Sequence, residues 1–465
     1  MQVNRNKNMF GKKKSSGMGK FIFILIIFAG LSGYIYTSDK FERIEPTITL
    51  HNSGYWSKKA NIEIDISDNY LLKNYQVIVE DGANRFELAK EEFINDVREK
   101  KIYIKYPSKL PISKNIKKLK ITIIVNDKSL WNMGIGNNTT KSIILKIDHT
   151  KPKIKIISHS YSIRKGGSAL VIFEATDESI DEIYIDTKKH KFKAQPYYKK
   201  GYYASLIAWE FNQDKFVASI VVKDKAGNTR ERKIPIYLKD KEYKVSYIQA
   251  KDKFIDGKIS DLITTDSKYD DITDRLEKLK AINEDMRINN ENLIHKLGKG
   301  LSQNLFKRWR IKKFHPLSRA AVVATFGDER HYYYENRDNE ISQSYHVGLD
   351  LASTAMAPIV SSNAGLVVFA DENGIYGNMP MIDHGMGLYS IYGHCSSLLV
   401  SQGDIIKAGT KIAQTGKSGL ALGDHLHFGI LVQGVEVRIA EWMDGKWIKT
   451  NIDNIFKEAS ERIGK

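Results

Sequence analysis

The stretch "ALGDHLHFGI", residues 421–430, places two histidines one residue apart. If this stretch is a β-strand, His425 and His427 point to one face and Leu426 and Phe428 to the other, because side chains alternate along a strand. A half-exposed strand with two polar residues needs no chemistry to explain it. Whether the pair has a chemical role therefore depends on which other polar side chains share its face.

A second piece, "SYHVGLDLAS" at residues 344–353, places His346 and Asp350 four residues apart. Alternation and the intervening Gly348 favour a strand, on which these three residues would share one face. The glycine between the two polar side chains would leave room for an ion. This piece therefore offers an imidazole and a carboxylate to a common site.

A third piece, "SIYGHCSS" at residues 390–397, would place Tyr392 and His394 on one strand face. Together the three pieces supply four histidines and one carboxylate. Two neutral imidazoles and one carboxylate are a common ligand set for catalytic zinc, which keeps a fourth position for water. Zinc lowers the pKa of this water and polarises a carbonyl, so amide hydrolysis is the chemistry that the set predicts. The two remaining histidines would move protons and stabilise the oxyanion, but the spacing does not decide which two they are.

The motifs "HVGLD" (346–350), "YGH" (392–394) and "HLH" (425–427), with "TGKSG" (415–419) before the last, resemble those of the lysostaphin-type (LytM-like) zinc endopeptidases. Members of that family cleave peptide cross-links of peptidoglycan. The resemblance extends over about residues 315–440. It implies a small antiparallel β scaffold with a groove that is walled by loops.

Position by position, the resemblance implies that zinc is bound by His346, Asp350 and His427. It implies that His394 and His425 are the catalytic residues beside the bound water and the scissile carbonyl. All five positions are filled, which implies an active enzyme, because relatives that only activate other cell-wall enzymes typically lack some of these residues.

Several neighbouring residues receive other interpretations. Cys395, the single cysteine, follows His394 directly, but adjacent residues of a strand face opposite ways, so we expect a buried small residue and no nucleophile. His384 precedes a glycine turn and is expected to be structural. The stretch "DERHYYYENRDNEISQS", residues 328–344, is rich in tyrosine and charge, and we place it on a wall of the groove.

The N-terminal part predicts a membrane anchor. Residues 1–20 carry many positive charges and no acidic residue, and residues 21–38 follow without any charge. As a helix these 18 residues span about 27 Å, enough for a bilayer core, and the basic flank predicts a cytoplasmic tail with the rest exported. A cleaved signal peptide is the alternative, although no clear cleavage site follows the apolar run. We expect a single-pass protein of the inner (cytoplasmic) membrane with a periplasmic or extracytoplasmic catalytic domain.

The charge and the cysteine content of the chain limit which partners and which covalent cross-links we expect. The chain has 465 residues, which predicts several domains, and it carries 72 Lys and Arg against 55 Asp and Glu. This excess suits an anionic partner, but no nucleic-acid module is recognisable, so we predict no nucleic-acid binding. A single cysteine in an exported chain excludes an internal disulfide framework.

Short β segments fill residues 45–150 and 151–245, and a weak repeat pairs Asp68 with Asp177 and Asp127 with Asp224. The repeat length of about 100 residues fits one immunoglobulin-like β-sandwich each. The two segments resemble bacterial immunoglobulin-like modules, which usually act as spacers or docking surfaces.

Residues 256–312 change to a helical pattern, with apolar positions such as Ile272, Leu276 and Leu279 at spacings of four and three. This predicts an amphipathic or short coiled-coil segment that either dimerises the protein or packs on its own chain. The predicted zinc endopeptidase domain follows at residues 313–445, with a tail at 446–465.

The sequence therefore predicts a mainly β, membrane-anchored zinc metalloendopeptidase. Its partner would be peptidoglycan, in which a D,D-cross-link is the expected bond, and its role would be in cell-wall growth, shape or separation. Other cell-envelope proteins are further expected partners. The alternative is a non-enzymatic wall-binding scaffold or an activator of other cell-wall hydrolases.

Overall fold

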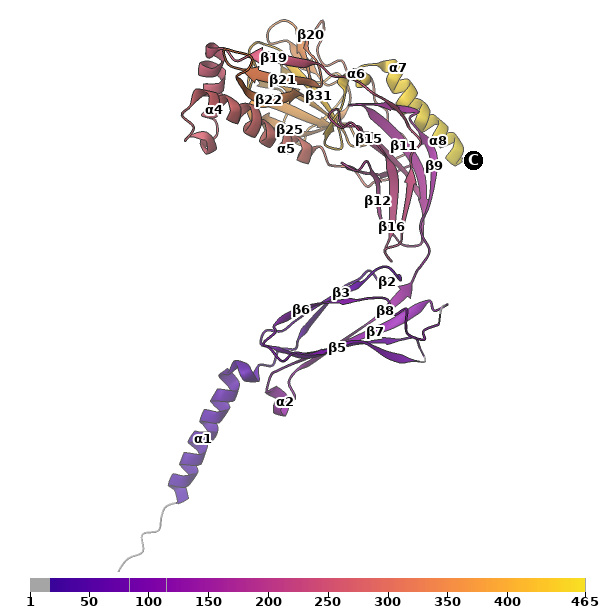
Figure 1. The fold of residues 1–465 in the computed structure, drawn as a ribbon, viewed down its shortest axis with the longest axis vertical. Helices are drawn as coiled ribbons and strands as arrows, with labels where there is room; N and C mark the ends of the chain where they lie inside the picture. Colours follow the sequence, from indigo (N-terminus) through magenta and orange to yellow (C-terminus); the bar gives the residue numbers. More distant parts are fainter. Residues whose placement is uncertain (1–16, 83, 114, 465) are drawn as a thin grey trace, which may run out of the picture. The chain divides into compact units, whose positions relative to one another are not determined.

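The computed structural model describes residues 17–82, 84–113 and 115–464. The chain divides into two compact units (Figure 1). Unit 1 comprises Met1–Thr150 with Lys225–Asn228, and unit 2 comprises Lys151–Asp224 with Thr229–Lys465. Each unit is described by itself below.

Unit 1 begins with the helix α1 (Gly17–Thr37), followed by the short 3₁₀ helix η1 (Asp39–Phe41). Within the described residues, Met18–Thr37 is the one helix that is long and apolar enough to cross a membrane. Its large apolar side chains are exposed, as a lipid-facing helix requires. Most of the predicted cytoplasmic tail, residues 1–16, lies outside the described residues.

The rest of unit 1 is a β-sandwich of two sheets. Alternate residues of its strands point inward, and the core includes Trp56, Ile62 and Ile64, all fully buried. The three-stranded sheet has the order β1 (Thr47–His51), β3 (Ile62–Ser67), β6 (Glu99–Ile104). The five-stranded sheet has the order β2 (Tyr55–Trp56), β8 (Asn138–Ile147), β7 (Lys118–Asp127), β4 (Leu72–Glu80), β5 (Arg85–Glu92), and the four-residue α2 (Trp131–Gly134) precedes β8.

Unit 2 begins with a second β-sandwich. One sheet has the order β14 (Gln195–Pro196), β15 (Tyr202–Ala208), β11 (Ser168–Thr176), β9 (Lys153–His159). The other has the order β13 (Lys191–Lys193), β12 (Ile180–Asp186), β16 (Ser219–Asp224), β17 (Thr229–Lys233). A short parallel pair joins β10 (Ser162–Arg164) to β18 (Tyr237–Lys239).

The third set of strands, here called the C-terminal β domain, has one large sheet and two small ones. The eight-stranded sheet has the order β20 (Ala321–Ala324), β23 (Leu349–Ala352), β31 (Leu426–Val432), β27 (Leu388–Gly393), β26 (Asn378–Asp383), β25 (Gly365–Glu372), β29 (Ile405–Ile406), and β32 (Val435–Glu436) pairs with β31. The three-stranded sheets have the orders β19 (Val245–Gln249), β21 (Asp328–Tyr333), β22 (Glu340–His346) and β24 (Pro358–Val360), β30 (Lys411–Gln414), β28 (Ser397–Leu398). The short 3₁₀ helix η5 (Gly374–Tyr376) lies between β25 and β26.

The C-terminal β domain and the second β-sandwich share one hydrophobic core. The same cluster of buried residues contains Phe173 and Leu206 of the sandwich and Leu426, Phe428 and Trp442 of the later part of the chain. The two parts of unit 2 are therefore expected to depend on each other for stability.

The helical segment packs on its own chain, which is one of the two predicted alternatives. Its elements are η2 (Phe254–Ile259), α3 (Ser260–Ile263), η3 (Ser267–Tyr269), α4 (Arg275–Lys280), η4 (Ala281–Met286) and α5 (Arg287–Leu297). Leu279 and Met286 are buried in one cluster with Ile375 and Tyr376 of the C-terminal β domain. In Figure 1, α4 and α5 lie against this domain, and α4 and η4 contact β22. The predicted apolar face is thus used inside unit 2.

The predicted tail is helical. It follows α6 (Ile439–Trp442) and consists of α7 (Gly445–Ile448), η6 (Lys449–Asp453) and α8 (Asn454–Gly464). Helix α8 runs beside β9 and β11 of the second sandwich (Figure 1). The hydroxyl of Ser158 donates a hydrogen bond to Glu458 Oε2 at 2.6 Å, which fixes the helix to β9.

A buried carboxyl between α6 and β11 predicts that the folding stability depends on pH. Glu441 is 5% exposed and accepts a hydrogen bond from the backbone N–H of Ser168 at 3.0 Å. Burial raises the pKa of Glu441 from 4.5 to about 7. The folded state therefore favours the protonated carboxyl, and the stability that this form contributes is complete below the unfolded pKa and is lost as the pH rises through about 7.

We expect Glu441→Gln, which stays neutral, to remove roughly 2–3 kcal/mol of the stability loss between pH 5 and pH 8. Urea unfolding followed by tryptophan fluorescence at both pH values measures this difference, with Glu461→Gln, at an exposed position of α8, as a control. Identical pH dependence of the Glu441 variant and the parent chain would contradict the assignment.

Candidate metal centre

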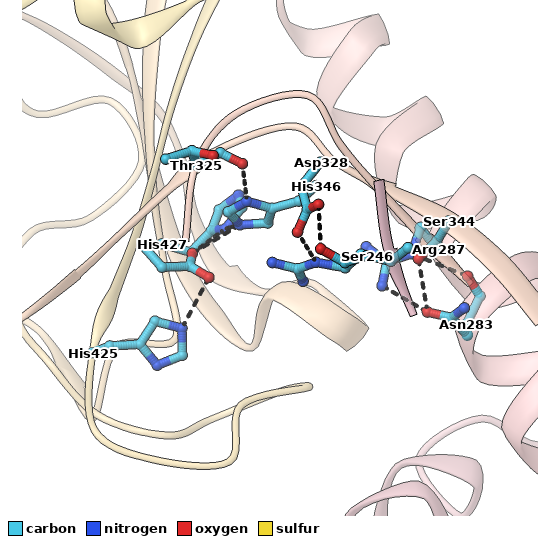
Figure 2. A network of polar contacts seen from close by, with 11 residues as sticks. Ser246, Asn283, Arg287, Thr325, Asp328, Ser344, His346, His425 and His427 are labelled. Carbon is cyan, nitrogen blue, oxygen red and sulfur yellow. Dashed lines mark hydrogen bonds and ion pairs between the residues drawn. The ribbon is translucent and has the colours of Figure 1, made fainter. Parts of the chain in front are cut away.

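Three side chains converge at the centre of the C-terminal β domain. His346 Nε2 lies 2.9 Å from Asp350 Oδ1, and His427 Nδ1 lies 2.9 Å from the same oxygen. The two ring nitrogens are 3.2 Å apart. His346, Asp350 and His427 are 5%, 8% and 6% exposed. Figure 2 shows the two imidazoles meeting, with His425 beside them.

Strand pairing positions two of the three. Asp350 of β23 stands directly opposite His427 of β31 in an antiparallel ladder, so both side chains emerge on one face of the large sheet. The opposite face of β31 carries Leu426 and Phe428, both fully buried. This is the alternation that the sequence predicted for "HLHF".

The predicted single strand through His346 and Asp350 is wrong. Strand β22 ends at His346 and β23 begins at Leu349, and the two belong to different sheets. The chain bends at Gly348, where a Cβ atom would lie 2.2 Å from His427 Cε1. The bend therefore brings His346 to Asp350 from a neighbouring sheet and packs the backbone on the His427 ring.

The residues fit a metal ion. His346 Nδ1 donates a hydrogen bond to the carbonyl oxygen of Thr325 at 2.9 Å, which leaves the lone pair of Nε2 facing Asp350 and His427. One atom from each residue lies within 4.8 Å of the others, and the observed separations are close to the spacing of about 3.3 Å between tetrahedral zinc ligands. His427 Nε2 is buried without a hydrogen-bond partner among the described residues, so the polar contacts of this ring with the cluster go through Nδ1.

Local electrostatics favour the ligand forms. Burial lowers the pKa of His427 to about 4, so the imidazole is neutral near pH 7, as a metal ligand must be. Burial alone would raise the pKa of Asp350, but the close contacts with His346 and His427 outweigh it and hold this pKa far below its usual range. The centre thus offers two neutral imidazoles and one carboxylate.

Two further histidines flank the centre. His394 Nδ1 donates to the carbonyl oxygen of Ser418 at 2.9 Å, and His425 Nδ1 donates to that of Gly423 at 2.8 Å. Because a carbonyl only accepts, each ring keeps its Nε2 free to accept a proton. The two ring centroids are 4.8 Å apart, and His425 Nε2 lies 3.8 Å from Asp350 Oδ2. Burial, with His427 and His425 nearby, lowers the pKa of His394 to about 3.

The predicted common face of Tyr392 and His394 is wrong. His394 follows the end of β27 and has a φ of 65°, in the left-handed region, which turns its side chain away from the strand alternation. The Tyr392 ring instead packs in the core, with its centroid 5.3 Å from that of Phe428. Cys395 is fully buried, and burial raises the pKa of its thiol to about 12, which agrees with the expected small core residue.

The comparisons with known proteins identify the domain that carries this centre. Residues 344–439 match the family model described as Peptidase family M23. These residues form an M23 peptidase domain. The match includes all five residues described above and ends in α6.

Named relatives match about a fifth of this chain. Over 88 residues the chain is 36% identical to the peptidoglycan DD-endopeptidase ShyB of Vibrio cholerae, covering 19% of this chain and 21% of that protein. Over 92 residues it is 34% identical to the DD-carboxypeptidase/endopeptidase Mpg of Neisseria meningitidis, covering 20% of this chain and 21% of that protein. The chain thus spans about a fifth of the length of the curated relatives that it matches.

Solved structures with similarity include a putative peptidase M23 from Pseudomonas aeruginosa, with 16% identity and a TM-score of 0.37, covering 61% of this chain and 95% of that one. The catalytic domain of lysostaphin from Staphylococcus simulans has 23% identity and a TM-score of 0.22, covering 27% of this chain and 92% of that one.

A cavity of about 810 Å³ opens beside the M23 centre. The four histidines and Asp350 line it, together with residues that the motifs did not indicate, such as Tyr376 and Arg287. The ring of Tyr376 lies 5.3 Å from that of His427, between centroids. Periodicity alone showed that the helical segment has an apolar face, but it gave no signal that Arg287 reaches this cavity.

The tyrosine-rich stretch lies only partly on the groove wall. Tyr332 of β21 lines the cavity. Tyr334 instead donates a hydrogen bond to Asp252 at 2.9 Å, and His331 stacks on Tyr247 with ring centroids 5.0 Å apart. His384 hydrogen-bonds the Ala364 carbonyl at 2.9 Å, in keeping with its expected structural role.

Proposed function

We propose that the chain is a zinc-dependent metalloendopeptidase that hydrolyses peptide cross-links of peptidoglycan, with a D,D-bond as the substrate. The observation that carries the proposal is the convergence of His346, Asp350 and His427 beside two free imidazole nitrogens, inside an M23 domain. The names of the relatives, a peptidoglycan DD-endopeptidase among them, support the substrate class.

In this proposal His346 Nε2, Asp350 Oδ1 and His427 Nδ1 hold the zinc ion. When bound, zinc supplies Lewis-acid chemistry to the water and to the scissile carbonyl. His394 and His425 each keep Nδ1 bound to a backbone carbonyl, so their Nε2 atoms face the centre in fixed orientations. One of them accepts the proton of the attacking water, and the imidazolium so formed stabilises the oxyanion before it returns the proton to the leaving amine.

We further propose that α1 anchors the protein in the inner membrane and that the M23 domain works outside the cytoplasm. The length and exposed apolar surface of α1 support an anchor. The β-sandwich of unit 1 and that of unit 2 would then act as a spacer between membrane and wall. All five motif positions are filled, so we do not favour the non-enzymatic scaffold.

The direct test uses the full chain in detergent with purified peptidoglycan. We expect cross-linked dimers to be converted to monomers, the conversion to stop with a chelator, and added zinc to restore it. A fragment of residues 313–465 is a poor substitute, because its core continues into the second β-sandwich. Cleavage that resists chelation, or no cleavage after zinc is restored, would contradict the proposal.

A further inference from the structure

Part of the wall of the groove comes from outside the matched M23 segment. Ile248 of β19, Phe254 of η2 and Arg287 of α5 line the cavity together with the four histidines. Strand β19 is held there by parallel pairing with β21. The part of the substrate that this wall contacts therefore meets residues outside the segment that matches the M23 family model.

The lining of the groove has an excess of positive charge. Two carboxylates line it, and both are engaged: Asp350 at the metal centre, and Asp424, which accepts hydrogen bonds from Thr415 Oγ1 at 2.6 Å and from the backbone N–H of Met356 at 3.1 Å. Against these stand the cations Lys251, Lys253, Arg287 and Arg330. A groove of this charge favours an anionic ligand.

The four cations are not equivalent. The Arg330 guanidinium forms an ion pair with Asp328, whose Oδ2 lies 3.3 Å from Arg330 Nε. Asp328 Oδ1 also accepts a hydrogen bond from Ser246 Oγ at 2.6 Å. Lys251 and Lys253 are exposed and have long, flexible side chains. Arg287 is half-buried and has no carboxylate within ion-pair distance among the described residues.

Arg287 is held in place by a buried network. Its Nε donates to the Asn283 carbonyl at 3.0 Å and its Nη2 to Asn283 Oδ1 at 2.9 Å. Asn283 is 1% exposed; it donates to Ser342 Oγ at 2.5 Å and accepts from Ser344 Oγ at 3.2 Å. Figure 2 shows Arg287, Asn283 and Ser344 beyond Ser246 and Asp328, as seen from His346 and His427, and both serines of the network belong to β22, which ends at His346.

This network leaves Arg287 suited to an outside anion. Nη1 makes no hydrogen bond within the described part of the chain, so one edge of the guanidinium is available. Glu291, which interacts electrostatically with Arg287, has a pKa that burial raises to about 7, so it offsets the charge of the arginine only in part. A planar guanidinium that is held from behind binds a carboxylate at a small cost in side-chain entropy.

We propose that Arg287 binds a free carboxylate next to the scissile bond and so selects cross-links made through a diamino acid such as diaminopimelate over those made through lysine. In diaminopimelate the carbon that bears the cross-linked amine also bears a carboxylate, whereas in lysine that carbon bears only hydrogen. The carboxylate is therefore one carbon away from the amide that is cleaved. This inference rests on the proposed function.

The test compares two cross-linked muropeptide dimers that differ only at this carboxylate, free in one and amidated in the other. We expect the full chain to prefer the free form by about 10- to 100-fold in kcat/KM, because a charged hydrogen-bonding group would lose its partner in the amidated form. Arg287→Gln should abolish the preference by lowering the rate on the free dimer far more than the rate on the amidated dimer, while the metal content stays that of the parent chain. Arg287→Lys should recover part of the preference.

Lys253→Gln is the matched control, since it removes a cation from the same cavity. Unlike Arg287, Lys253 is exposed and is not held by a hydrogen-bond network among the described residues. This substitution should change both rates alike. Equal rates of the parent chain on both dimers would overturn the inference. An equal loss of rate on both dimers in Arg287→Gln would also overturn it, because Arg287 would then bind another carboxylate of the substrate or serve to stabilise the fold.

A binding measurement separates this inference from the proposed function. Calorimetry with the two dimers reports the carboxylate preference whether or not they are cleaved. Preferential binding of the free form that Arg287→Gln abolishes would support the inference even if no cleavage occurred, and absence of cleavage in the parent chain would overturn the proposed function alone. Equal binding of both dimers by the parent chain would overturn the carboxylate site.

Discussion

His427→Ala is expected to abolish metal retention and to lower cross-link cleavage by at least about 10³-fold. His427 Nδ1 faces Asp350 Oδ1 at 2.9 Å and His346 Nε2 at 3.2 Å, so its loss removes one of three candidate ligand atoms. Alanine also leaves Asp350 buried with one hydrogen-bond partner fewer. Metal content by mass spectrometry and kcat on a cross-linked dimer measure the two effects.

His425→Ala provides the matched comparison, because it removes the other histidine of "HLH". His425 Nε2 is 3.8 Å from Asp350 Oδ2, farther than the ligand atoms are from one another, and its Nδ1 bonds the Gly423 carbonyl. We expect this variant to keep its metal and to lose about 10²- to 10⁴-fold in kcat, the usual contribution of a proton-transferring group. Equal metal loss in both variants would show that the roles of the pair are assigned wrongly.

Much of this centre could be predicted from the sequence. Alternation placed His427 opposite the face of Leu426 and Phe428, and the structure confirms that both apolar residues are fully buried. The contact of His346 with Asp350 was also expected, although the local structure differs: a bend between two sheets replaces the continuous strand. Residue types and spacing were sufficient to predict a shared site, because two residues four apart share one face of a strand and can also meet across a bend.

The remainder depends on long-range packing, which strand and helix periods do not encode. The left-handed φ of His394 is a property of one backbone position, without a sequence signal in the histidine itself. Arg287 reaches the groove only because Leu279 and Met286 pack beside Tyr376 and orient the helical segment. Likewise, the amphipathic tail gave no indication of its partner, which is the second β-sandwich.

Gly348→Ala should weaken metal binding by at least about 100-fold without removing any ligand. A Cβ atom at this position would lie 2.2 Å from His427 Cε1 and 2.3 Å from its Nε2, so the imidazole has to move. The ring has little room for this movement, because it is buried and its Nδ1 is bound to Asp350. Titration with zinc, together with cleavage measured at each zinc concentration, reports the affinity and the activity.

Gly445→Ala is the matched control, because its added Cβ would meet only Lys313 Cδ at an ordinary 3.8 Å. This variant should bind zinc and cleave cross-links as the parent chain does. If the Gly348 variant fails only by displacing the ring, high zinc should restore part of its activity, since all three ligand atoms are still present. Parent-like zinc affinity in Gly348→Ala would instead mean that the His427 ring is free to shift, and that the bend between β22 and β23 does not position the metal.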